Sequence, residues 1–187
     1  MEALFQFLRS FHPLPEELVD YLRQVVKKKE VYKRHFVCRP GQICQHIYFI
    51  EKGLFRCYYS RDNRDISSGF MLEGDVCISV ESFFGQQKSE ESIQALENSL
   101  VYFISYEELQ DLYRRFPVLN IIGRLLMEKY YRLSRHQSFI MQVCKAEERY
   151  HWLVSHSPEL IFRVRLKHIA SYLGISDVML SKIRGKW

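Results

Sequence analysis

The stretch RLKHIASYLGISDVMLSKIRGKW, residues 165–187, decides the fold of the C-terminal part of the chain. Ile169 and Leu173 lie on one face of a first predicted helix. Gly174 follows at the point where the end of a helix favours a left-handed residue. Ser176 is a good N-cap for a second helix. These signals predict two short helices joined by a tight turn.

The second predicted helix separates apolar from polar positions. Leu180 and Ile183 are three residues apart and face inward. A structural helical hairpin would share this pattern, but the basic outer face favours a helix-turn-helix whose second helix enters the DNA major groove. The residues predicted to contact DNA are Arg165, Lys167, Ser176, Asp177, Val178, Ser181, Lys182, Arg184 and Lys186.

Positive charge is concentrated in the same part of the chain. The 187 residues contain 27 Lys and Arg against 22 Asp and Glu, a net charge of +5. Residues 145–187 hold eight of these basic residues against four acidic ones, so nearly all of the excess lies there. A basic module attached to a nearly neutral one indicates a polyanionic partner, with nucleic acid ahead of a membrane surface.

Upstream of this module, residues 118–143 predict one long helix. Its apolar residues recur three and four positions apart, with interruptions at Lys129 and His136. One interpretation is that this stripe packs on the chain's own β domain. The favoured interpretation is a seam between two copies of the chain. The predicted interface residues are Leu119, Ile122, Leu126, Leu133 and Ile140.

The part before the long helix changes from helices to strands. Residues 1–29 read as helical, and residues 31–103 carry turn signals at intervals of about 8–12 residues, separated by aromatic and β-branched runs. This spacing predicts a β-sandwich or roll. Ser105 and Glu108 then form a predicted capping box for a short helix that stops near Pro117.

The predicted fold class is α+β, with a double-stranded β-roll, a long dimerisation helix and a C-terminal helix-turn-helix. The corresponding domains are residues 1–117, 118–143 and 144–187. A hydrophobic fraction of 47% and a charged fraction of 26% are ordinary for a globular protein. No run of about 18 apolar residues and no secretory signal is evident, so a cytoplasmic protein without membrane association is expected.

Enzymatic and metal-binding motifs find no support. The five cysteines, Cys38, Cys44, Cys57, Cys77 and Cys144, form no CxxC pair and are expected to be free thiols. An iron–sulfur cluster would require clustered ligands. The chain lacks a P-loop, GxSxG, HExxH and the His-x-His of a metal-binding cupin. We therefore expect no catalytic residues, no metal and no resident cofactor.

Several motifs resemble the Crp/Fnr family of transcription regulators. The resemblance rests on AEERY (146–150), IASYLGIS (169–176), LSKIR (180–184) and, in the β half, on RPG (39–41), YFIEKG (48–53) and EGD (73–75). It covers nearly the whole chain. It implies a cyclic-nucleotide-binding-like β-roll and a cytoplasmic bacterial homodimer that reads a palindromic operator. It also implies an effector sensed in the roll, with RNA polymerase as a candidate further partner.

The β-roll departs from family members that bind cyclic AMP. Those members carry a Gly-Glu pair for the ribose and an Arg-Ser or Arg-Thr pair for the cyclic phosphate. The matching positions here read Ile78-Ser79 and Ser89-Glu90. A buried phosphate beside carboxylates, with only Lys88 nearby, would be repelled, so cyclic AMP is not the expected effector. The predicted effector pocket consists of Ser79, Glu81, Lys88, Ser89 and Ser92.

The recognition helix departs from the family as well. Val178 stands where many relatives present Glu, and Ser181 and Lys182 follow. Valine offers only apolar contact to a base, so the operator should differ at that position. The sequence ends at Trp187, and a helix-turn-helix without a full wing is expected. The alternative function is a ligand-binding roll that acts through protein contacts, with a vestigial DNA-binding domain.

Overall fold

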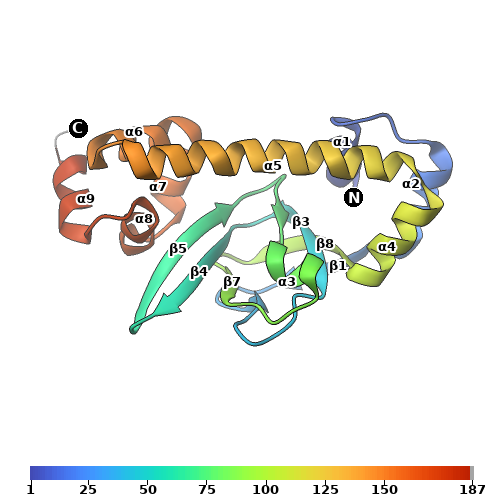
Figure 1. Cartoon of the computed structure of the whole chain (residues 1–187), viewed down its shortest axis with the longest axis horizontal. Coiled ribbons are helices and arrows are strands. Elements are labelled where there is room, and N and C mark those ends of the chain that lie inside the picture. Colours follow the sequence, from blue (N-terminus) through green and yellow to red (C-terminus); the bar gives the residue numbers. More distant parts are fainter. Residues whose placement is uncertain (186–187) are drawn as a thin grey trace. The chain divides into compact units, whose positions relative to one another are not determined.

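The computed structural model describes residues 1–185, so Lys186, Trp187 and the expectation about the wing lie outside the described residues. The chain forms two compact units (Figure 1). The first, here called the roll unit, contains residues 1–58 and 70–128. The second, here called the C-terminal unit, contains residues 59–69 and 129–187, of which the structure describes those up to 185. The predicted long helix contributes to both units.

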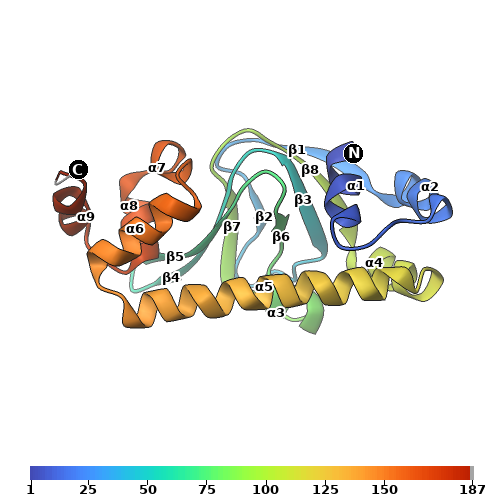
Figure 2. The same cartoon turned by 90° about the horizontal axis from the view of Figure 1, so that it is seen from above.

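Two antiparallel sheets build the roll (Figure 2). Within residues 1–185, their strand orders are β1-β8-β3-β6 and β2-β7-β4-β5. The strands are β1 (Lys27–Val31), β2 (Phe36–Cys38), β3 (His46–Lys52), β4 (Phe55–Arg61), β5 (Arg64–Met71), β6 (Val76–Cys77), β7 (Glu91–Ala95) and β8 (Ser99–Ser105). A short helix, α3 (Val80–Gly85), lies between β6 and β7. The predicted β-roll is confirmed.

The inner faces of the two sheets make the main core. Ile50, Phe55, Ile93 and Val101 come from four different strands and are fully buried in it. The alternation of side chains along each strand explains how one face of a strand supplies the core while the other does not. At the tight turn between β3 and β4, Gly53 adopts a φ of 113°, which favours glycine.

Three helices form a second core beside the sheets. They are α1 (Glu2–Arg9), α2 (Glu16–Val25) and α4 (Tyr106–Arg115). The predicted capping box is present at the start of α4, because the Ser105 hydroxyl accepts from the Glu108 amide and the Glu108 carboxylate accepts from the Ser105 amide. Leu18, Leu22 and Leu112 lie at the centre of this core.

The predicted long helix is α5 (Val118–Val143), with the expected boundaries. Its expected dimer seam needs correction at two positions. Leu119 and Ile122 pack into the second core of the roll unit and are almost fully buried there. Ile140 is also buried, Leu126 is partly buried and Leu133 is exposed. The first turns of the predicted apolar stripe therefore pack into the chain's own core.

The C-terminal unit contains the predicted helix-turn-helix. Its helices are α6 (Ala146–His156), α7 (Leu160–Arg163), α8 (Leu166–Leu173) and α9 (Asp177–Arg184). Gly174 ends α8 with a φ of 67°, and the Ser176 side chain caps α9 by accepting from the Met179 amide at 3.2 Å. Both local predictions are confirmed.

Candidate nucleic-acid interface and effector region

A small apolar core fixes the angle between α8 and α9. Ile169 and Leu173 of α8 and Leu180 and Ile183 of α9 are nearly or fully buried. Arg149 of α6 strengthens this arrangement: its Nη1 donates to the Leu173 carbonyl at 3.0 Å and its Nε to the Cys144 carbonyl at 2.9 Å. One guanidinium thus joins the end of α8 to the segment that follows α5.

The outer surface of this pair is polar and open. Seven of the predicted DNA-contacting side chains in the described part are exposed together with the apolar Val178, which is 65% exposed. Sequence reasoning missed Met179, which is 41% exposed beside Val178. A helix of this kind can present its first residues to base edges while nearby cations contact phosphates. The exposed described residues are Arg165, Lys167, Ser176, Asp177, Val178, Ser181, Lys182 and Arg184.

The predicted effector pocket comes together only in part. Ser79 and Ser89 are buried, and their hydroxyl oxygens lie 3.2 Å apart. Ser89 also donates to the Glu91 carbonyl and accepts from its amide. Glu81 and Lys88 are exposed and are absent from these contacts. The alternation along β7 places buried Ser92 on the face opposite Glu91.

Glu91 is the interior residue that sequence reasoning missed. Burial raises the pKa of its carboxyl, a hydrogen bond from Ser79 opposes that rise, and the charge of Glu81 adds to it. No cation takes part in this balance. The sequence signal that could have found it is that Glu91 alternates with the apolar Ile93 and Ala95, which places all three on one face of β7. An anionic cyclic phosphate at this cluster would meet a carboxylate, so these residues do not fit cyclic AMP.

Arg56 is a second buried charge that sequence reasoning missed. It is 1% exposed on β4, and its guanidinium lies 4.2 Å from the centre of the Tyr58 ring. Phe55 and Cys57 face the core between the sheets, so the alternation of the strand puts Arg56 on the other face. Its side chain therefore leaves β4 on the face away from Phe55 and Cys57.

The cysteines are free thiols, four of them buried in the roll unit. A hydrogen bond with Cys44 lowers the pKa of Cys38 to about 7, while the same bond raises the pKa of Cys44. Burial raises the pKa of both Cys57 and Cys77 well above the usual value. Among residues 1–185, no three His, Cys, Asp or Glu side chains gather in a way that could hold a metal ion.

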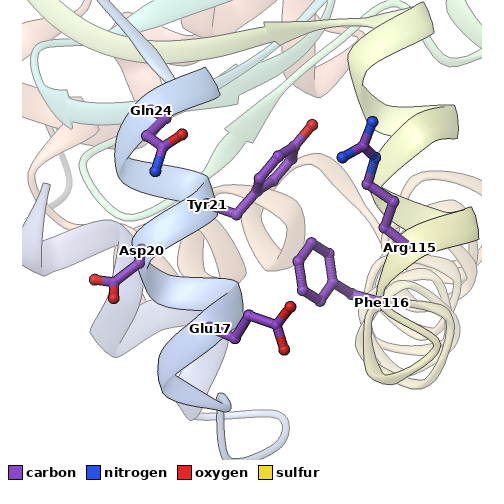
Figure 3. A pocket seen from close by; sticks show the side chains of 6 residues that line it. All are labelled: Glu17, Asp20, Tyr21, Gln24, Arg115 and Phe116. Carbon is purple, nitrogen blue, oxygen red and sulfur yellow. The ribbon is translucent and has the colours of Figure 1, made fainter.

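An open pocket lies elsewhere in the roll unit, between α2 and the end of α4 (Figure 3). Tyr21 points from α2 toward Arg115 and Phe116, and its hydroxyl donates to Asp111 at 3.0 Å. Arg115 pairs with the same carboxylate at 2.7 Å and lies over the Tyr21 ring. Tyr21, Asp111 and Arg115 thus bond to one another, and we interpret the pocket as the junction of two packed helices. The remaining lining residues are Glu17, Asp20 and Gln24.

None of the described helices is both long enough and apolar enough to cross a membrane. This finding concerns residues 1–185.

Comparison with known proteins found a family model that matches part of the chain and relatives that match nearly all of it. Residues 28–116 match the family described as the cyclic nucleotide-binding domain. The chain is 27% identical over 187 residues to the fumarate and nitrate reduction regulatory protein of Vibrio cholerae, covering 93% of this chain and 74% of that protein. It is 24% identical to the anaerobic regulatory protein of Haemophilus influenzae, covering 93% and 72%.

Solved structures show the same fold. FixK2 from Bradyrhizobium japonicum superposes with a TM-score of 0.73 at 16% identity, covering 87% of this chain and 84% of that one. CLP from Xanthomonas campestris, described as a c-di-GMP responsive global regulator, gives 0.69 at 18% identity, covering 92% and 91%. At this identity the likeness concerns the fold.

The chain thus joins a roll that matches the cyclic nucleotide-binding domain family to a long helix and a helix-turn-helix. The relatives are named as regulatory proteins, not as enzymes. Over nearly its whole length the chain is similar to these regulatory proteins, as its resemblance to the Crp/Fnr family implied.

Proposed function

We propose that this regulator binds a palindromic DNA operator as a homodimer and that the effector of its roll is not cyclic AMP. The exposed outer face of α9, held on a buried core and flanked by cations, is the observation that carries the proposal. Lys182 donates to a guanine edge, and Val178 makes apolar contact with a thymine methyl. Arg165 and Lys167 contact phosphates. Acting on DNA, the protein works in the bacterial cytoplasm.

Ser176 combines two roles in this proposal. Its hydroxyl oxygen accepts from the Met179 amide and so caps α9. The hydroxyl hydrogen remains a donor, and a backbone phosphate at the start of a recognition helix can accept it. The positive end of the helix dipole favours the same anion.

The dimer seam follows the exposed apolar residues of α5. Ile121, Phe139 and Val143 are 40%, 54% and 65% exposed. Ile121 and Phe139 are 18 residues apart, which is about five helical turns, so they point in one direction. Two such stripes can pack as a coiled-coil seam. This face lies about a third of a turn or more away from the one that begins with buried Leu119 and Ile122.

The oligomeric state of Phe139→Asp tests this seam. Light scattering at micromolar concentration should give the mass of a monomer, because an aspartate in the seam loses apolar burial and adds a charge. Ser134→Asp is the matched control, because Ser134 is exposed and lies about 140° around α5 from Phe139, so this variant should remain dimeric. A dimeric Phe139→Asp variant would place the seam elsewhere.

Selection from a randomised duplex DNA pool tests the central proposal. The expected product is an inverted repeat with half-site centres about 34 Å apart, one turn of DNA. Lys182→Ala should relax one position of each half-site at a cost of about 1–3 kcal/mol. Lys167→Ala, the control for charge, should weaken all sequences equally and reduce the salt dependence. Recovery of no motif, with and without cell extract as a source of effector, would overturn the proposal.

The effector part has its own test. Cyclic AMP at micromolar concentration should give no heat of binding in calorimetry, because the cyclic phosphate would meet the Glu91 carboxyl and find no cation among the groups around it in residues 1–185. Saturable micromolar binding would contradict this part alone.

Phe162 favours a protein partner in addition to DNA. It lies in α7 and is 88% exposed, while Leu160 and Val164 on either side are buried. An exposed aromatic ring can serve as an anchor at a protein interface. RNA polymerase is the partner we propose. Phe162→Ala should reduce transcription at the selected operator and leave DNA affinity unchanged; equal transcription would exclude this contact.

A further inference from the structure

The far part of the β4–β5 hairpin, residues 59–69, belongs to the same compact unit as the helix-turn-helix. Its contacts with α8 include the side chain of Ser171. The Ser171 hydroxyl donates to the Asp65 carbonyl at 2.8 Å and accepts from the Ser67 amide at 3.0 Å. One serine thus makes two hydrogen bonds to the backbone of one strand.

The two backbone groups that Ser171 bonds have the spacing that a neighbouring β-strand would use. β5 is the last strand of its sheet, and an edge strand presents its outward N–H and C=O groups at every second residue. Asp65 and Ser67 are two residues apart. A serine hydroxyl is both a donor and an acceptor, so it can satisfy both groups at once. Ser171 therefore takes the place of a missing neighbouring strand.

A second helix holds the same strand. The Gln137 side chain of α5 donates to the Ser68 carbonyl at 3.2 Å. Ser67 is 4% exposed, so its backbone lies in a covered place where an unmade hydrogen bond is costly. Three backbone groups of β5, in Asp65, Ser67 and Ser68, thus bond to side chains of α8 and α5.

This attachment leaves the recognition surface open. Ile169, Ala170 and Leu173 of α8 face the helical core, whereas Ser171 bonds to the hairpin. The outer residues of α9, including Val178 and Lys182, stay exposed. The contact therefore positions the helix-turn-helix and does not mask it.

We propose that Ser171 is a positioning residue through which the β4–β5 hairpin sets the orientation of the recognition helix. The inference rests on the proposed DNA-binding function. β4 begins at Phe55 and β5 ends at Met71, both in the roll unit, while Asp65 and Ser67 between them bond to Ser171 of α8. A change in the roll can thus reach α8 along two strands as well as along α5.

The test compares three full-length variants. Ser171→Ala removes both bonds, and alanine favours the helix, so the fold is retained. Ser171→Thr keeps a hydroxyl and should restore the wild-type behaviour. Ser138→Ala is the matched control, because the Ser138 hydroxyl bonds only within α5, to the Ser134 carbonyl.

Two measurements give independent readouts. Amide hydrogen exchange at Ser67 should be about two- to tenfold faster in Ser171→Ala, the effect of about one net hydrogen bond. Affinity for the selected operator should fall by a similar factor, with the selected sequence unchanged. Ser171→Thr and Ser138→Ala should match wild type in both.

Wild-type exchange at Ser67 in Ser171→Ala would overturn the contact. Faster exchange with unchanged operator affinity would overturn the positioning role. Loss of DNA binding by wild type itself would instead count against the proposed function, and the exchange measurement would still decide the contact.

Discussion

The helix-turn-helix and the interior of the β-roll differ in how well their residues suit the function that the fold implies. In the first, local residues still suit the proposed task, with a cap at Ser176, a left-handed Gly174 and an open basic face. In the second, the strands persist but the polar interior holds Ser79, Ser89 and Glu91 without a cation among their contacts in residues 1–185. A fold can thus be retained while the chemistry of one of its sites changes.

The largest expected effects on the free energy of unfolding come from two turn glycines, Gly53 in the roll and Gly174 in the helix-turn-helix. A Cβ on Gly53 would lie 2.1 Å from the Ser99 Oγ and 2.7 Å from the Ser99 Cα, so backbone atoms would have to move. A Cβ on Gly174 would meet only the end of the Arg149 side chain, at 3.3 Å. Gly53→Ala should cost about 3 kcal/mol or more in the free energy of unfolding. Gly174→Ala should cost about 1–2 kcal/mol for its left-handed backbone.

Denaturant unfolding followed by the fluorescence of the two tryptophans, Trp152 and Trp187, both in the C-terminal unit, and by far-UV circular dichroism would measure both glycine variants. Gly53→Ala should shift chiefly the circular dichroism transition, where the roll dominates the strand signal. An equal cost at the two positions would mean that Ser99 relaxes more easily than its buried place indicates.

The sequence predicted the regions unequally because its signals differ in range. The cap at Ser176, the turn at Gly174 and the capping box at Ser105 involve residues three or four apart, and all three are present. The burial of Leu119 depends instead on helices about one hundred residues earlier, such as the one that carries Leu18. Periodicity identifies an apolar stripe but does not identify what covers it.

The effector region shows the same limit. Ser79 and Ser89 were predicted and do meet, because the segments before and after α3 return to one place. Glu81 and Lys88 were chosen by proximity in the chain, yet both are exposed. The deciding residue, Glu91, faces inward through the register of β7, which depends on pairing with β2, more than fifty residues away. Long-range pairing is not encoded in a local motif.

A smaller effect, with an opposite sign, is expected at Glu91. Its pKa is raised in the folded chain, so the folded state favours the protonated carboxyl. The stability contributed by this group is full below its usual pKa of 4.5 and is lost as pH rises through the raised value. Glu91→Gln should therefore raise the free energy of unfolding at pH 7, by about 1 kcal/mol.

Thermal unfolding of wild type and Glu91→Gln between pH 4 and pH 8 checks this sign. The gap between the two proteins should be small at pH 4 and should widen toward neutral pH. Glu90→Gln is a matched control on an exposed neighbour and should show no such widening. A gap that narrows with rising pH would mean that a cation stabilises the Glu91 carboxylate.

The smallest expected changes in stability concern two serine N-caps, one in each unit. Ser105 accepts from the Glu108 amide in the roll unit at 3.1 Å, and Ser176 accepts from the Met179 amide in the C-terminal unit at 3.2 Å. Each serine-to-alanine change should cost about 0.5–1 kcal/mol in unfolding free energy. Only Ser176→Ala should also weaken operator binding, because only that hydroxyl is proposed to meet a phosphate.

Ser176→Asp separates the two roles of that serine. Aspartate is an equally good N-cap and suits the helix dipole, so the stability of α9 should return to the wild-type value. Its carboxylate would repel a phosphate, so operator affinity should fall below that of Ser176→Ala. Calorimetry of unfolding and a salt titration of DNA binding measure the two effects separately. If Ser176→Asp restored both, the hydroxyl would act only as a cap, and the start of α9 would not approach the DNA backbone.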